Sequence, residues 1–173
     1  LRIAVLSPDL RLHSCAFFLE PIVRDLDRRQ FELYLYHDHF REDTVSERLR
    51  SHAAVWRNFV GQPAQVVEKT IRADAPDILI DLAGHTGLNR LPLLAGRLAP
   101  VQISYLGYPN ATGVAAMDYR FTDAIADPEG EADGFATERL VRFSETAWSY
   151  EPPADAPDVA AAPVKRNGHV TFG

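Results

Sequence analysis

The chain of 173 residues has little of several residue types and patterns, and each shortage excludes a class of protein. Its single cysteine, Cys15, rules out a disulfide within the chain and a cysteine-rich zinc site. No apolar run reaches the ~18 residues that a membrane span needs. No basic leader with a small-residue cleavage site marks the chain for secretion. We therefore expect a cytoplasmic protein without a membrane partner.

Positive charge is also scarce. The 18 Lys and Arg residues face 24 Asp and Glu residues, which leaves a net charge of −6. Such a chain offers no basic field for a phosphate backbone, so we expect no nucleic-acid partner. Its hydrophobic fraction of 46% and charged fraction of 24% are typical of a globular domain rather than a disordered chain or a coiled coil.

The sequence predicts three parts along the chain. Residues 1–150 have the length and patterning of one domain. Residues 151–168 are rich in proline and alanine and have almost no bulky apolar residue, so we expect an extended linker. Residues 169–173 are expected to start the first strand of a second domain that these residues do not include.

Short apolar runs alternate with segments of helical period in residues 1–150. The runs predict strands at 2–6, 31–36, 77–82, 101–106, 118–122 and 139–143. Apolar spacing predicts helices over 19–26 with Pro21 in the first turn, after a Thr44–Glu47 capping box, between Ala64 and Pro76, and around 88–97. This alternation predicts an α/β fold, a Rossmann-like parallel sheet flanked by helices.

Three polar or glycine-rich loops follow predicted strands, at residues 7–15, 84–89 and 107–113. Ligands of such sheets collect outside the carboxyl ends of the strands, so we expect the three loops to form a cleft. In the first loop, Asp9 and His13 are close enough in sequence to reach one bound group. The alternative is that Asp9 caps the following helix and His13 is a surface residue.

The second loop places His85 and Thr86 between two glycines, where the backbone can approach a ligand closely. The alternative is an ordinary tight turn with a half-buried histidine. The third loop could offer backbone N–H groups and a ring wall, or could be a plain turn with its tyrosine in the core; its residues are Leu106, Gly107, Tyr108 and Pro109.

Other motifs give no support to further classes of enzyme. His37 and His39 resemble a metal-binding pair, but no further ligand is close in sequence, and we expect no metal site. No GxGxxG follows the first strand, and neither GxxxxGK[ST] nor GxSxG occurs. These absences disfavour a Rossmann dehydrogenase, a P-loop NTPase and an α/β-hydrolase.

Several segments of the chain form a recognisable series. They read LRIAVLSPDLRLHS followed by AFFLEP, then DILIDLAGHTGLNR, APVQISYLGYP and MDYRFTD. In this order and spacing, they resemble the catalytic region of bacterial protein O-GlcNAc transferases. The resemblance implies the amino-terminal half of a GT-B glycosyltransferase, in which two Rossmann-like halves face a cleft. It also implies inverting transfer of N-acetylglucosamine from UDP-GlcNAc to Ser or Thr hydroxyls of proteins, with UDP-GlcNAc as substrate and neither cofactor nor metal. The implied partners are the carboxy-terminal catalytic half of the same chain, upstream tetratricopeptide repeats and acceptor proteins.

The resemblance also assigns roles by position. Asp9 matches an aspartate of the family's proton-transfer chain, and His13 matches its active-site histidine, proposed as a base or as a group that positions donor and acceptor. His85 matches a cleft position, with Thr86 beside it. A segment near the sugar and the acceptor is matched by Leu106, Gly107, Tyr108 and Pro109.

Three positions depart from the family pattern. Ser14 and Leu98 stand where the family usually has proline, and Asn110 stands where it usually has glycine. Two other functions stay open at this point. One is a non-catalytic Rossmann-like binding module. The other is a different sugar-nucleotide enzyme, such as an epimerase or an N-linked glucosyltransferase.

Overall fold

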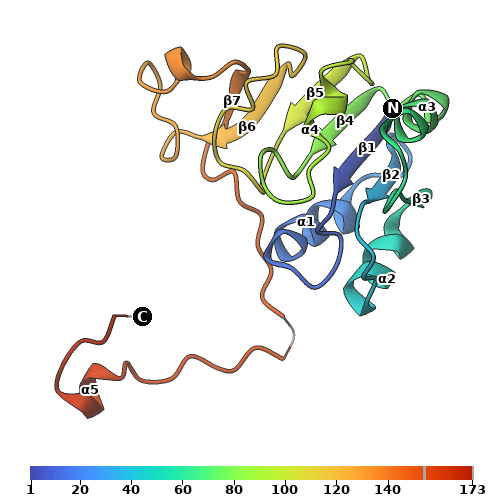
Figure 1. Ribbon diagram of the computed structural model, residues 1–173. Helices are drawn as coiled ribbons and strands as arrows, with labels where there is room; N and C mark the ends of the chain where they lie inside the picture. Colours follow the sequence, from blue (N-terminus) through green and yellow to red (C-terminus); the bar gives the residue numbers. More distant parts are fainter. Residues whose placement is uncertain (154, 173) are drawn as a thin grey trace.

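The computed structural model describes residues 1–153 and 155–172, and a parallel β-sheet forms its centre (Figure 1). Seven strands lie in the order β3-β2-β1-β4-β5-β6-β7, and every neighbouring pair is parallel. The strands are β1 (Arg2–Ser7), β2 (Glu32–His37), β3 (Val55–Asn58), β4 (Ile78–Asp81), β5 (Val101–Ser104), β6 (Tyr119–Asp123) and β7 (Arg139–Phe143). The predicted Rossmann-like α/β fold is confirmed.

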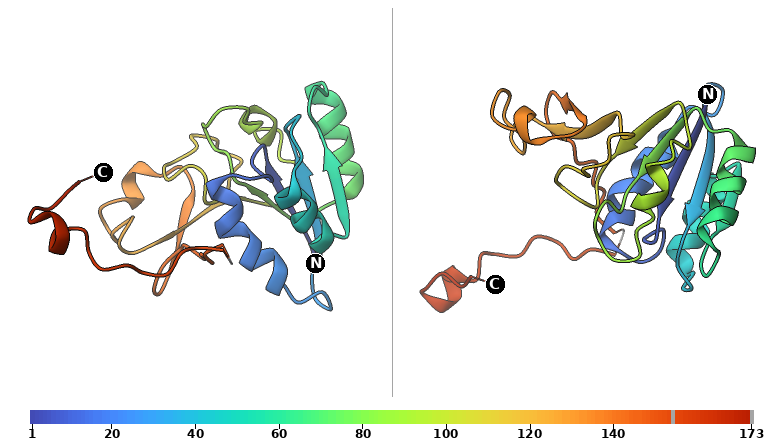
Figure 2. Two further views of the ribbon diagram at one scale, coloured as in Figure 1. Left: turned by 90° about the horizontal axis from the view of Figure 1, so that it is seen from below. Right: turned by 45° about the horizontal axis from the view of Figure 1, so that its top comes forward.

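Helices cover both faces of the sheet (Figure 2). On one face, apolar residues of α1 (Ser14–Asp25) and α2 (Thr44–His52) pack on the strands. On the other face, α3 (Ala64–Asp74) and the single turn α4 (Leu91–Leu94) do the same. A short 3₁₀ helix, η1 (Asp133–Phe135), precedes β7. Since both faces are covered, the central strands are mostly apolar, as in β1, where Ala4, Val5 and Leu6 are at most 2% exposed.

Six of the seven strands lie where the apolar runs predict them, and β3 is the exception. It has four residues, VWRN, all partly buried, and it forms one edge of the sheet beside β2. An edge strand needs no continuous apolar run, because one side of its backbone has no neighbouring strand. Because two of its four residues are polar, a search for apolar runs does not find β3.

Three predictions about the helices are wrong in detail. Helix α1 begins at Ser14 rather than near residue 19, so Pro21 lies inside the helix and not in its first turn. The capping residue of α2 is Asp43, paired with Ser46, because Thr44 is already the first helical residue. The predicted helix around 88–97 is reduced to α4, since Leu88 and Arg97 on either side have positive φ angles of 61° and 47°.

Residues 155–172 are exposed, form no strand and contain the single helical turn α5 (Val164–Asn167) (Figure 1). Residues 169–172, where the sequence predicts a new strand, have no strand structure. Residue 173, the end of that predicted strand, and residue 154 of the predicted linker lie outside the described residues. Among the described residues, no helix is both long enough and apolar enough to cross a membrane.

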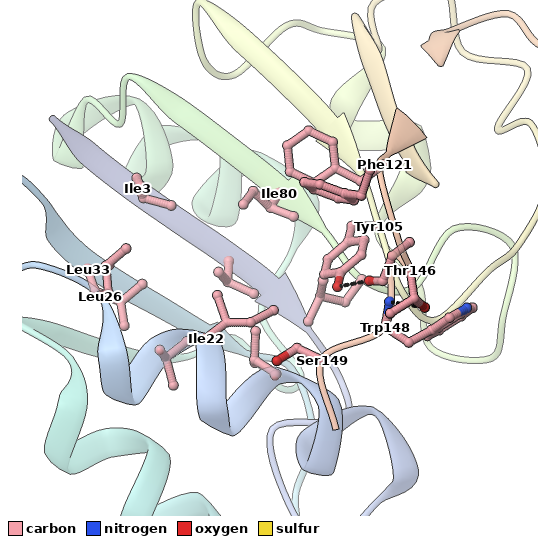
Figure 3. Close-up of a pocket in the computed structure, with 16 residues that line it drawn as sticks. Ile3, Ile22, Leu26, Leu33, Ile80, Tyr105, Phe121, Thr146, Trp148 and Ser149 are labelled. Atoms are coloured by element: carbon pink, nitrogen blue, oxygen red, sulfur yellow. Dashed lines mark hydrogen bonds between the residues drawn. The ribbon is translucent and has the colours of Figure 1, made fainter. Parts of the chain in front are cut away.

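An apolar cavity of about 370 Å³ lies between α1 and the sheet (Figure 3). Ile22 lines it from α1 and Leu26 from just after that helix, while Ile80 and Phe121 line it from the strands. None of its lining residues is charged. The chain that follows β7 closes one end with Trp148. Since this cavity has no titratable side chain other than Tyr105, whose hydroxyl donates to the Ala147 carbonyl, the polar chemistry lies elsewhere.

Candidate functional site

The carboxyl-terminal ends of the neighbouring strands β1, β4 and β5 are aligned with one another along one edge of the sheet. Leu6 of β1 pairs with Asp81 of β4, and Asp81 of β4 pairs with Ser104 of β5. The loops that follow these strands therefore start side by side, as expected for a parallel sheet. These loops contain the sequence-predicted site residues.

Asp9 lies in the loop between β1 and α1, and its neighbours fix its position. Its backbone N–H donates to Ser7 Oγ at 3.0 Å. Its carboxylate accepts a hydrogen bond from Arg11 Nη2 at 3.2 Å, and its Oδ1 lies 3.8 Å from Nε2 of His13. Asp9 does not cap α1, so the alternative in which it is only a helix cap is wrong.

His13 is the capping residue of α1. Its Nδ1 accepts a hydrogen bond from the Cys15 backbone N–H at 3.2 Å. A neutral imidazole that accepts through Nδ1 carries its proton on Nε2. The Nε2–H therefore lies on the Asp9 side, and 3.8 Å is too long for a direct hydrogen bond between them. In this arrangement His13 is a hydrogen-bond donor at the edge of the sheet.

Helix α2 holds the first loop in place from outside. The Asp43 carboxylate accepts the Leu12 N–H at 3.0 Å, and Ser46 Oγ donates to the Leu10 carbonyl at 2.7 Å. The same Asp43 accepts the Val45 N–H at 3.1 Å and so caps α2. The position of Asp9 and His13 thus depends on a second helix that starts thirty residues further along the chain.

The third loop packs against the first at Gly107. A Cβ atom placed on Gly107 would lie 1.9 Å from the Leu82 carbonyl oxygen and 3.4 Å from Cys15 Sγ. Only glycine permits this approach of the loop to the end of β4 and the first turn of α1. Cys15 Sγ itself lies within 4.8 Å of ligand atoms of Asp9 and His13. Gly107 is therefore close to the Asp9–His13 pair.

The second loop packs against the third through His85 and Tyr108. The two rings meet edge to face with their centroids 5.1 Å apart. His85 Nε2 lies 2.7 Å from the Thr112 carbonyl, to which it donates, and Thr86 Oγ1 donates to the Ala83 carbonyl at 2.7 Å. The structure thus brings all three loops together, with His85 exposed and Thr86 partly buried.

The residues of the third loop differ in what they expose. Leu106 has a positive φ of 73°, and the residue is buried in the apolar cluster on the α1 face. Tyr108 is half-buried and Pro109 is exposed. Tyr108 packs on the second loop rather than in the apolar core, which excludes the alternative of a plain core tyrosine.

Asp9, His13 and Cys15 have donor atoms of the types that zinc prefers. A metal ion bound there would have to displace protons from two of these groups. Burial and the charge of Asp9 raise the pKa of the Cys15 thiol to about 11, and the capping bond leaves the proton of His13 on the nitrogen nearer Asp9. The guanidinium of Arg11, 3.2 Å from Asp9, adds a repelling charge. His37 and His39 belong to no group of three potential metal ligands in the described part of the chain.

Asp81 is a residue of this edge that sequence reasoning missed. Its side chain is fully buried at the end of β4, where Oδ2 accepts the Gly84 N–H at 2.7 Å. Burial raises the pKa of this carboxyl to about 6. The signal in the sequence is a charged residue inside the apolar run DILIDL, in a strand that both sheet neighbours cover.

Comparison with known proteins gives a consistent set of relatives. The family described as glycosyl transferase family 41 matches residues 1–149. The chain is 38% identical over 175 aligned residues to a petunia protein named "Probable UDP-N-acetylglucosamine--peptide N-acetylglucosaminyltransferase SPINDLY", which covers 99% of this chain and 19% of the relative. It is 32% identical to the UDP-N-acetylglucosamine--peptide N-acetylglucosaminyltransferase of Caenorhabditis elegans over 84% of this chain and 13% of the relative.

A solved structure agrees with these matches. A mutant of the O-GlcNAc transferase of Thermobaculum terrenum superposes with a TM-score of 0.89 and 40% sequence identity, over 94% of this chain and 31% of that one. The chain thus spans about a fifth of the length of the petunia relative and a third of the solved one. On the family match to residues 1–149, this chain belongs to glycosyltransferase family 41.

Proposed function

We propose that this chain forms one wall of a site that transfers N-acetylglucosamine from UDP-GlcNAc to Ser or Thr hydroxyls of proteins, with inversion at the anomeric carbon. The observation that carries the proposal is the meeting of three loops at one sheet edge. There, Asp9 lies 3.8 Å from His13, and Gly107 and Tyr108 link that pair to the turn of His85. The names of the relatives supply the donor and the acceptor class.

Inverting transfer needs a hydroxyl to attack the anomeric carbon from the side opposite the UDP group. The bond from the hydroxyl oxygen to that carbon forms, the bond to the diphosphate oxygen breaks, and UDP leaves with the electron pair. The hydroxyl proton must pass to a base, and orientation of the reactants supplies much of the rate. The site therefore needs a group that orients and a group that accepts a proton.

Asp9 and His13 fit these two needs. The Nε2–H of His13 donates to an oxygen of the donor or the acceptor, because its Nδ1 is occupied by the Cys15 amide. The carboxylate of Asp9 is the base toward which the hydroxyl proton moves, since it lies 3.8 Å from the His13 nitrogen that orients the reactants. The guanidinium of Arg11 orients the Asp9 carboxylate through its hydrogen bond.

The other predicted site residues bind the sugar and the acceptor. His85 and Tyr108 present a ring and a hydroxyl at the mouth of the site, and Thr86 stabilises the turn below them. The backbone of Leu106, Gly107 and Pro109 contacts the sugar. We propose that a carboxy-terminal half of the same polypeptide supplies the nucleotide contacts without a metal, and that tetratricopeptide repeats upstream guide acceptor proteins to the cleft.

The test is transfer by a longer polypeptide that carries residues 1–173 together with the second half. UDP-GlcNAc and Ser- or Thr-containing acceptor peptides are mixed with it, and intact mass detects an added N-acetylhexosamine. We expect glycosylated peptide with the native residues and almost none with Asp9→Asn. The matched control is Asp158→Asn, an exposed aspartate in the segment after the domain, which should leave the rate unchanged. Equal transfer by Asp9→Asn, or no transfer from any sugar nucleotide by the unmodified enzyme, refutes the proposal.

A further inference from the structure

Asp81 has no role in the chemistry above, yet it lies directly behind the site. It is the last residue of β4, and the turn of His85 and Thr86 follows it within five residues. Its neighbours in the sheet are Leu6 on β1 and Ser104 on β5, both uncharged. A carboxylate in such surroundings is costly to bury, so its position calls for a compensating interaction.

Only one of its two carboxylate oxygens is satisfied by the described residues. Oδ2 accepts the Gly84 N–H at 2.7 Å, whereas Oδ1 is buried without a hydrogen-bond partner. Burial raises the pKa of Asp81, while the amides of Gly84 and Ala83 and the charge of His85 act in the opposite direction. The hydrogen bond of the Asp81 side chain is therefore made to Gly84, in the turn that leads into the site.

The Asp81–Gly84 hydrogen bond holds a glycine that touches the third loop. Gly84 has a φ of +51°, and a Cβ atom on it would lie 2.4 Å from Cβ of Tyr108. The Tyr108 ring in turn meets the His85 ring at 5.1 Å, and His85 is held by the Thr112 carbonyl. A shift of the Gly84 backbone would therefore move both His85 and Tyr108.

We propose that Asp81 is a positioning residue: through its bond to the Gly84 amide, it sets where His85 and Tyr108 stand at the mouth of the site. The claim that these two rings face substrate rests on the function proposed above. The coupling from Asp81 to the rings does not rest on it. Both parts can be measured separately.

The coupling is tested by nuclear magnetic resonance on the 173-residue chain. We expect the Gly84 amide resonance to titrate with an apparent pKa close to 6. In Asp81→Asn the titration should vanish, while the amide stays hydrogen-bonded because an asparagine oxygen also accepts. In Asp81→Ala the hydrogen bond should be absent, and the nuclear Overhauser effects between the rings of His85 and Tyr108 should disappear with it.

Two controls separate this coupling from other causes of the titration. His85 is a second titratable group near Gly84, and its charge acts on Asp81. If Asp81 causes the titration of the Gly84 amide, that titration should remain in His85→Gln. Asp77→Asn changes an aspartate just before the opposite end of β4, where it accepts the Arg2 N–H, and should not alter Gly84. A Gly84 titration that survives in Asp81→Asn, or nuclear Overhauser effects between the rings that survive in Asp81→Ala, overturns the coupling.

The functional part is tested in the longer polypeptide. Asp81→Asn should transfer at nearly the native rate, and Asp81→Ala should lower kcat roughly 100-fold with little change in the donor KM, because displaced groups orient the reactants poorly. Native kcat in Asp81→Ala, in a protein where the two rings no longer meet, overturns the positioning role. An enzyme that transfers no sugar even with native residues refutes the proposed function instead, while the coupling measured by resonance still stands.

Discussion

Replacing Asp81 with asparagine should change how stability depends on pH. The pKa of this carboxyl is raised from 3.8 to about 6 in the folded protein, chiefly by burial. Since the folded state holds the proton more tightly than the unfolded state, the contribution of Asp81 to native stability falls as pH rises from about 4 to about 6 and then stays level. Asparagine carries no such proton.

The size of the effect follows from the difference between the two pKa values. At roughly 1.4 kcal/mol per pKa unit, the free energy of unfolding of Asp81→Asn relative to native should rise by about 3 kcal/mol from about pH 4 to about pH 7. The asparagine amide would take the place of the unpartnered Oδ1, which adds a destabilising offset of about 1–3 kcal/mol that does not vary with pH.

Urea unfolding followed by circular dichroism measures this difference at several pH values. Titration of all other groups cancels in the comparison with the native chain. The control is Asp158→Asn, which changes an exposed carboxylate after the domain and should follow the native curve. A difference that is flat across this pH range, or that falls as pH rises, refutes the reasoning about the buried carboxylate.

Three further predictions concern residues that shape the site. Gly107→Ala should lower the free energy of unfolding by at least about 3 kcal/mol, measured by urea titration, since its Cβ would lie 1.9 Å from a backbone oxygen; unchanged stability would contradict the close approach. His13→Ala should lower the unfolding free energy by about 1 kcal/mol through loss of the α1 cap, whereas His13→Asn should retain it; equal effects of the two would contradict a capping role. Asp43→Ala should cost about 1–2 kcal/mol and increase hydrogen exchange at the Leu12 amide, and an unchanged exchange rate there would show that α2 does not hold the first loop.

The sheet could be predicted from the sequence because its central strands are covered on both faces. The run from Leu1 to Leu6 has few polar residues, and it becomes a strand whose last residues are nearly inaccessible. The edge strand β3 could not be found in this way, since Arg57 and Asn58 interrupt any apolar run. A search for apolar runs therefore finds the other six strands and misses β3, in which only two of the four residues are apolar.

Helix boundaries depend on contacts that a local pattern does not contain. The start of α1 is set by the His13 side chain, which is an unusual cap, so the helix extends back past the predicted start and includes Pro21. At α2 the capping residue is Asp43 rather than Thr44, and the Asp43 carboxylate also accepts the Leu12 N–H. That second bond comes from a loop thirty-one residues away.

The membership of the site could be predicted, but its internal contacts could not. That Asp9, His13, His85 and Tyr108 gather at one edge follows from the parallel sheet alone. The roles of individual atoms needed coordinates, such as the capping bond of His13 Nδ1 and the bond between His85 and the Thr112 carbonyl. These two bonds determine which nitrogen of each imidazole is left free. No sequence pattern identifies the Cys15 amide or the Thr112 carbonyl as the partner.

The most direct test of a catalytic wall at this edge is the transfer rate of His13→Asn in the longer polypeptide. This variant keeps the cap of α1 and hence the fold, but removes the imidazole donor beside Asp9. We predict a fall in kcat of roughly 100-fold or more, with native stability and little change in donor binding. A rate close to native in this folded variant would contradict a role for His13 in the reaction.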